Sequence, residues 1–66
     1  MEVAMLKVYI ENNKCFGKDS NGKNIMVYAF QLLKVLQKHN SYSIVKPIGK
    51  GNYRSYLISN DELIIC

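Results

Sequence analysis

The alternation of apolar and polar positions is most regular over residues 25–38. Apolar residues recur there every three or four positions with polar residues between them, which is typical of an amphipathic helix. The apolar stripe consists of Ile25, Ala29, Leu32 and Leu36, flanked by Tyr28 and Leu33, and the opposite side carries Gln31, Lys34, Gln37 and Lys38. The spacing therefore predicts a helix over residues 25–38, with Asn24 as its N-cap and residues 39–41 as its end.

Residues 14–28 also allow a second interpretation. The run Asp-Ser-Asn-Gly at residues 19–22 is a turn signal, because Asn-Gly adopts positive φ at little cost. The residues on either side of this turn would then pair as a hairpin, and the helix would begin near Ala29. We prefer the longer helix because the stripe is already in phase at Ile25, although the β-branched Ile25 and Val27 leave the hairpin open.

Strand patterns surround the predicted helix. Residues 3–10 alternate in polarity and predict one strand, which ends at a turn signal at residues 11–13. Residues 63–66 are apolar on both sides, which predicts a central strand. Together these patterns predict an α+β fold of a single domain over residues 1–66, with one amphipathic helix packed on a small antiparallel sheet in the order β-(β)-α-β-β-β.

Residues 42–48 and 53–58 predict an antiparallel hairpin around a glycine-rich turn. The simplest register places Ile44 opposite Leu57 and Val45 opposite Tyr56, so that both faces carry apolar pairs. Pro47 has no backbone N–H, which favours an edge position for its strand or a frayed end beside the turn. An apolar outer face, in a chain with so small a core, predicts a homodimer.

Composition limits the chemistry that the chain can perform. The 66 residues are 48% hydrophobic and 21% charged, which is typical of a globular protein. Cys15, Cys66 and the single His39 lack the spacing of a metal site, and no two carboxylates share a plausible site. We therefore expect no enzyme activity, no catalytic residue, no metal and no cofactor. The longest apolar run, residues 25–30, is too short for a membrane span, so a cytoplasmic location without membrane contact is expected.

Positive charge is concentrated in the middle of the chain. The net charge is +4, and residues 12–58 alone carry +7, which predicts one basic face. Lysine and arginine alternate there with tyrosine, a pattern that offers phosphate contacts beside rings for base stacking. The candidate nucleic-acid or anion-binding residues are Lys46, Lys50, Arg54, Tyr53 and Tyr56 on the hairpin, with Lys34 and Lys38 on the helix.

Residues 48–57, with the sequence Ile-Gly-Lys-Gly-Asn-Tyr-Arg-Ser-Tyr-Leu, resemble the glycine-rich loop of protein kinases. Arg54 stands where the third glycine of that loop belongs, and 66 residues leave no room for the catalytic loop of a kinase. The resemblance implies only that backbone N–H groups, with Lys50 and Arg54, hold an anion at the turn.

These observations predict a small, non-enzymatic regulatory binding protein. Its basic hairpin and helix face would contact nucleic acid or another polyanion. The alternative is a small adaptor or inhibitor, of the phage-like type that mobile genetic elements encode, which binds an acidic protein or an anionic ligand with the same surface. Binding measured at increasing salt distinguishes a nucleic-acid ligand from other partners.

Overall fold

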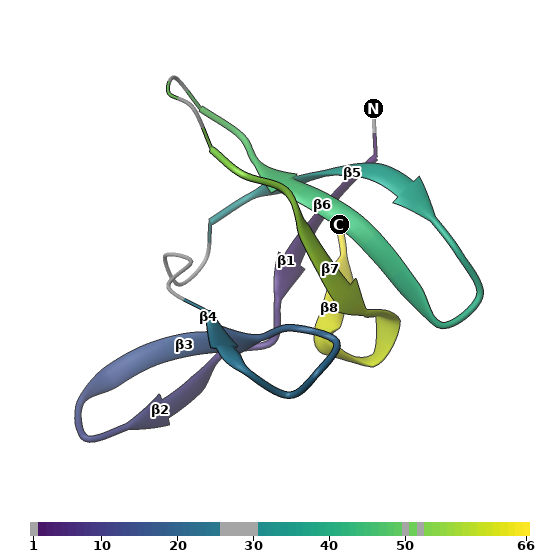
Figure 1. Cartoon of the computed structure of the whole chain (residues 1–66). Coiled ribbons are helices and arrows are strands. Elements are labelled where there is room, and N and C mark those ends of the chain that lie inside the picture. Colours follow the sequence, from purple (N-terminus) through teal and green to yellow (C-terminus); the bar gives the residue numbers. More distant parts are fainter. Residues whose placement is uncertain (1, 26–30, 50, 52) are drawn as a thin grey trace.

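The chain folds almost entirely into short antiparallel strands (Figure 1). The computed structural model describes residues 2–25, 31–49, 51 and 53–66. The strands are β1 (Val3–Leu6), β2 (Tyr9–Glu11), β3 (Lys14–Lys18), β4 (Asn24–Ile25), β5 (Leu33–Lys38), β6 (Tyr42–Pro47), β7 (Tyr56–Ser59) and β8 (Leu63–Ile65), and a 3-10 helix, η1 (Asn60–Glu62), precedes β8.

The strands form two sheets. The main sheet has five strands in the order β7-β6-β5-β1-β8, and the small sheet has three in the order β2-β3-β4. Every described strand pair is antiparallel. In Figure 1 the β2–β3 hairpin extends from the body on one side, while β6 and β7 run together towards the loop at the top. The first strand of the chain therefore lies inside the main sheet, between β5 and the C-terminal β8.

The predicted helix over residues 25–38 is wrong, and with it the α+β class and the order β-(β)-α-β-β-β. Asn24–Ile25 is strand β4 and Leu33–Lys38 is strand β5, while residues 26–30 lie outside the described residues. The helical pattern predicted that Leu32 and Leu36 are buried, yet the side chain of each is 45% exposed. The fully buried leucine of this segment is Leu33. Alternation at a period of two, with Leu33 and Val35 turned inward, describes β5 better than the period of 3.6.

The hairpin interpretation of the segment before residue 26 is confirmed. Asp19 Oδ1 accepts hydrogen bonds of 2.9 Å from the backbone N–H groups of both Asn21 and Lys23. Gly22 adopts a φ of 76°, as the Asn-Gly turn requires. These contacts turn the chain so that Asn24 pairs with Lys18 in β3. The side chain of Asp19 therefore organises the turn between β3 and β4.

Two other expectations about strands were wrong. Residues 3–10 form two strands in different sheets rather than one, because the chain leaves the main sheet after Leu6 and enters the small sheet at Tyr9. Strand β8 lies at an edge of the main sheet and not at its centre, and Ile64 and Ile65 are exposed. The turn expected at residues 11–13 is present, with positive φ at Asn12 and Asn13.

The predicted register of the second hairpin is confirmed. Ile44 pairs with Leu57 and Val45 pairs with Tyr56 across β6 and β7. Pro47 ends β6 beyond its last residue pair with β7, but it still pairs with Leu33 of β5, and β6 lies inside the main sheet rather than at its edge. Residues 39–41, which were expected to end a helix, connect β5 to β6 in a turn where the N–H of His39 donates to the carbonyl of Tyr42 (2.9 Å).

The core forms where the two sheets meet. Its buried apolar residues are Ala4, Leu6, Ile25, Leu33, Val45, Ile58 and Leu63, and all but Ile25 come from the main sheet. Gly17 of β3 is also buried, and a Cβ atom at this position would overlap the side chain of Leu6. Glycine is therefore needed here for space, because it allows the small sheet to approach β1 closely.

Three polar contacts join the peripheral elements to this core. The hydroxyl of Tyr9 in β2 donates to the carboxylate of Glu62 in η1, with oxygen distances of 2.7 and 2.9 Å. The N–H of Ser20, in the turn after β3, donates to the carbonyl of Leu57 at 3.1 Å. Lys7 donates its N–H to the carbonyl of Glu62 at 2.9 Å. The small sheet is thus fixed to both β7 and η1.

Candidate polyanion-binding surface

Two lysines lie directly opposite each other on the central strands of the main sheet. Lys34 of β5 pairs in register with Lys46 of β6, and both side chains are exposed. Their neighbours Leu33 and Val45 are buried, so alternation along each strand turns both lysines to the outer face. Like charges directly opposite each other on adjacent strands destabilise a sheet. Sheet stability therefore does not account for this pair.

A shallow groove of about 340 Å³ lies beside the two lysines. Its apolar walls are Leu36, which is 45% exposed, Ile48, which is 36% exposed, and Pro47. Gln31 fixes the position of Ile48, because its Nε2 donates to the carbonyl of Ile48 at 2.8 Å. We call the set of Lys34, Leu36, Lys46, Pro47, Ile48 and Gly49 the lysine groove.

The positive charge of the lysine groove has no acidic partner in the described part of the chain. All five acidic residues belong to that part, and the ion pair found there joins Lys38 to Glu2, with 3.4 Å between Nζ and Oε1. Neither Lys34 nor Lys46 makes such a contact with any described carboxylate. An anion that entered the groove would therefore meet two unneutralised ammonium groups and an apolar wall.

The structure brings together only part of the predicted basic surface. Lys34 and Lys46 meet in the lysine groove, although Lys34 lies on a strand and not on a helix. Lys38, the other residue assigned to the helix face, is in β5 and its ammonium group bonds to Glu2. Lys50 lies outside the described residues. The predicted helix face thus does not exist, and one of its two lysines is already paired.

Of the two tyrosines of the predicted surface, Tyr53 lies beside the lysine groove and Tyr56 does not. Tyr56 is half-buried, packs against the core and pairs with the inward-facing Val45. The guanidinium of Arg54 lies over the Tyr56 ring, 5.9 Å from its centroid. Tyr53 is exposed and its ring lies beside Gly49 and Gly51. Tyr56 and the two groove lysines therefore lie on opposite faces of the sheet, whereas Tyr53 lies next to Gly49 of the groove.

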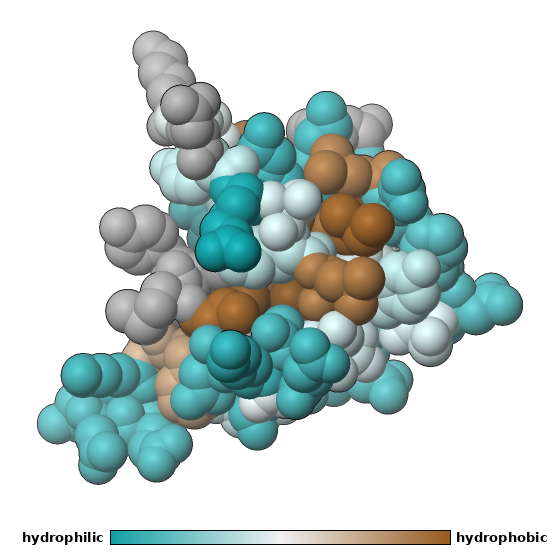
Figure 2. All heavy atoms as spheres, in the orientation of Figure 1, coloured by the Kyte–Doolittle hydropathy of each residue, from teal (hydrophilic) through white to brown (hydrophobic). Residues whose placement is uncertain are grey.

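Sequence reasoning missed the aliphatic walls of the groove. Leu36 was assigned to the core by the helical stripe, and Pro47 and Ile48 were read only as the end of a strand. The signal was present in β5, where Leu33 and Val35 alternate with the outward-facing Lys34 and Leu36. Figure 2 shows that exposed hydrophobic residues gather over the middle of the molecule, between hydrophilic regions. Exposed apolar residues beside lysines are thus part of the surface that a partner would contact.

No protein family, curated protein or solved structure matches this chain in the three comparisons made. Within the described ranges, no three His, Cys, Asp or Glu side chains are placed to hold a metal ion. Nor does that part of the chain contain a helix long and apolar enough to cross a bilayer. Fold and surface together define a small all-β protein with a basic, aliphatic-walled groove on its central strands.

Proposed function

We propose that this protein is a small, non-enzymatic and cytoplasmic binding module that holds a polyanion, most directly nucleic acid, on the outer face of β5 and β6. The observation that carries this proposal is the cross-strand pair of Lys34 and Lys46, which has no described acidic partner. Two like charges in this arrangement destabilise the sheet, so the pair is not there for stability. Lysines that neutralise phosphates release bound counterions and so supply affinity that does not depend on base sequence.

A second candidate function is supported by the walls of the same groove. Leu36, Pro47 and Ile48 are aliphatic, and an apolar centre beside charged groups is typical of protein interfaces. On this view the chain is an adaptor or inhibitor that holds an acidic protein surface. The two functions differ in their ligand but share the two lysines.

Reversal of both charges tests the proposal. The variant Lys34→Glu/Lys46→Glu is compared with Lys7→Glu/Lys23→Glu, which changes the net charge equally at two exposed positions outside the groove. Binding to a single-stranded oligonucleotide, a duplex and heparin is measured over a range of salt concentrations. We expect the groove variant to lose about tenfold or more in affinity, and the slope of log K against log salt to fall by about 0.7 to 1 per lysine. The control should keep most of the affinity.

Two results would contradict the nucleic-acid proposal. Equal losses in the two double variants would show that net charge, and not the lysine groove, causes binding. If the wild-type protein bound neither nucleic acid nor heparin at low salt, a polyanion-binding function would be excluded. If the groove variant then failed to bind an acidic protein that the wild type and the control both bind, the adaptor function would take its place.

A further inference from the structure

A second basic surface lies on the small sheet, on the opposite side of β3 from the core. Gly17 and Cys15 occupy alternate positions of β3, and Gly17 is packed against Leu6. Alternation therefore places Lys14, Phe16 and Lys18 together on the face that points away from Leu6. The paired strands add to this face Tyr9, opposite Phe16, Glu11, opposite Lys14, and Asn24, opposite Lys18.

The aromatic ring at the centre of this face is held in position. Phe16 is half-buried and stacks beside Tyr9, with ring centroids 5.9 Å apart and planes inclined by 22°. Tyr9 is fixed in turn by its hydrogen bonds to Glu62 and by the ammonium group of Lys18, which lies 4.5 Å from its ring centroid. A ring with a fixed orientation loses little conformational freedom when a ligand stacks on it.

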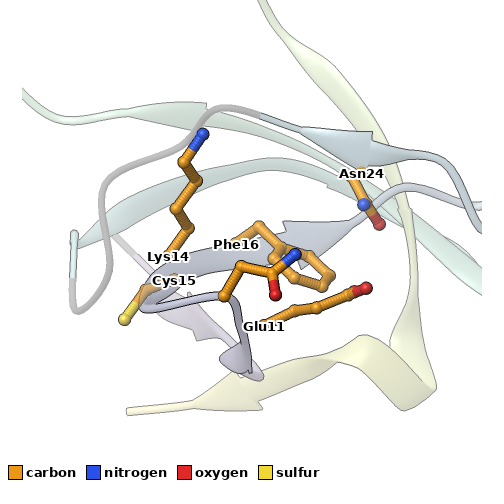
Figure 3. Close-up of a pocket in the computed structure, with 6 residues that line it drawn as sticks. Glu11, Lys14, Cys15, Phe16 and Asn24 are labelled. Atoms are coloured by element: carbon orange, nitrogen blue, oxygen red, sulfur yellow. The ribbon is translucent and has the colours of Figure 1, made fainter.

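A hollow of about 530 Å³ lies beside the Phe16 ring, a size within the range of about 300 to 1,000 Å³ that is usual for small-molecule sites. Figure 3 shows the Asn24 amide and the Glu11 carboxylate close to the ring, whereas the thiol of Cys15 points away from them. The hollow is lined by Glu11, Asn12, Lys14, Cys15, Phe16 and Asn24.

We propose that this hollow binds one unpaired nucleotide, either free or within a single strand. The base would stack on Phe16, and the amide of Asn24 would exchange hydrogen bonds with the base edge. Lys14 supplies a positive charge for the phosphate. The inference rests on the proposed function for its class of ligand, but its residues are distinct from those of the lysine groove.

The carboxylate of Glu11 makes the proposal more specific. A carboxylate accepts hydrogen bonds only, so it favours a base with amino or ring N–H donors, such as guanine, over one with mainly carbonyl groups on its edge, such as uracil. The combination of one aromatic ring, two amides, one carboxylate and one ammonium group therefore fits a nucleotide best.

Titration of the folded protein with mononucleotides tests this site. Guanosine monophosphate, uridine monophosphate and inorganic phosphate are added separately while the amide resonances of β2, β3 and β4 are followed by NMR. We expect guanosine monophosphate to shift these resonances at lower concentration than uridine monophosphate, and phosphate alone to leave Phe16 and Asn24 unchanged. The free and strand-bound forms are then separated by comparing the mononucleotide with a short single-stranded oligonucleotide of the same base.

Three variants assign the effect to the named side chains. Phe16→Leu should weaken nucleotide binding about tenfold, whereas Tyr53→Leu, which removes an exposed ring elsewhere, should not. Asn24→Ala changes an exposed residue and so tests the site even if Phe16→Leu proves unstable. Glu11→Gln should reduce the preference for guanine over uracil, because an amide donates as well as accepts.

The outcomes separate this inference from the proposed function. If Phe16→Leu and Asn24→Ala bind guanosine monophosphate as the wild type does, or if no mononucleotide shifts the small sheet, the nucleotide site is excluded, whatever the lysine groove does. Conversely, Lys34→Glu/Lys46→Glu should weaken binding of a long polyanion while leaving mononucleotide binding intact. Loss of mononucleotide binding in that variant would also overturn a separate site at Phe16.

Discussion

Asn60 is the residue that joins the turn after β7 to the tip of the β5–β6 hairpin. Its Oδ1 accepts a hydrogen bond of 2.6 Å from the hydroxyl of Ser43, which is only 1% exposed. Its Nδ2 donates to the carbonyls of His39 (2.8 Å) and Asn40 (3.2 Å). One amide thus satisfies a buried hydroxyl and two carbonyls of the hairpin turn.

We expect Asn60→Ala to lower the free energy of unfolding by about 1 to 3 kcal/mol, because the buried hydroxyl of Ser43 loses its acceptor. Chemical denaturation measures the change. The double variant Ser43→Ala/Asn60→Ala should recover part of the loss, since it removes the unsatisfied hydroxyl as well. An Asn60→Ala variant as stable as the wild type would contradict the role given to this side chain.

Tyr9 makes the contact between the small sheet and η1 sensitive to alkaline pH. The hydrogen bond to Glu62 raises the pKa of the Tyr9 hydroxyl above its ordinary value of 10.0, with a smaller contribution from desolvation. A raised pKa means that the folded state favours the protonated hydroxyl. The resulting stability is complete below pH 10, the value for the unfolded chain, and is lost as the pH rises through the higher value of the folded state.

This predicts a difference between wild type and Tyr9→Phe that depends on pH. The wild type should be the more stable protein near neutral pH, and its advantage should shrink above about pH 10 as the hydroxyl ionises beside the Glu62 carboxylate. Thermal melts of both proteins across this range provide the measurement. If the stability difference between the two proteins were the same at all pH values, ionisation of the Tyr9 hydroxyl would not affect stability.

At the scale of elements, β5 explains which parts of the fold the sequence could predict. The β6–β7 hairpin was predicted correctly to the residue pair, because Ile44 and Val45 meet their partners across a local turn. The strand over residues 33–38 was not predicted. Leu36 is apolar but faces outward, so it completes a helical stripe by coincidence. The same misassignment hid the lysine groove, since the pairing of Lys34 with Lys46 exists only when residues 33–38 form a strand. Local turns were readable, whereas pairings set by the whole sheet were not.

Adjacent leucines provide a direct test of the strand. Leu33→Ala should destabilise the protein by about 2 to 5 kcal/mol, because its side chain is fully buried, whereas Leu32→Ala should cost clearly less because this side chain is 45% exposed. Chemical or thermal unfolding of the two variants decides the order. A greater loss for Leu32→Ala would restore the helical interpretation and contradict the placement of β5.

The whole molecule exposes apolar surface that a second copy could cover. Leu57 is 43% exposed on β7, and the core is small for an isolated domain. The homodimer expected from the two apolar faces of the hairpin stays a prediction. Sedimentation at micromolar concentration should show a dimer in the wild type and a smaller species in Leu57→Ser. A single 7.6 kDa species in both would contradict it.

The position of β1 has a consequence for how fast the chain folds. β1 pairs with β5 on one side and with β8 on the other, and the N–H of Cys66 bonds to the carbonyl of Val3 at 3.1 Å. The main sheet is therefore complete only after the two ends of the sequence have met, and the loop closed by that encounter contains nearly the whole chain. The entropy of closing this loop is lost before the stabilising contacts between the ends can form. Refolding should therefore take milliseconds to seconds, which is slow for so short a polypeptide.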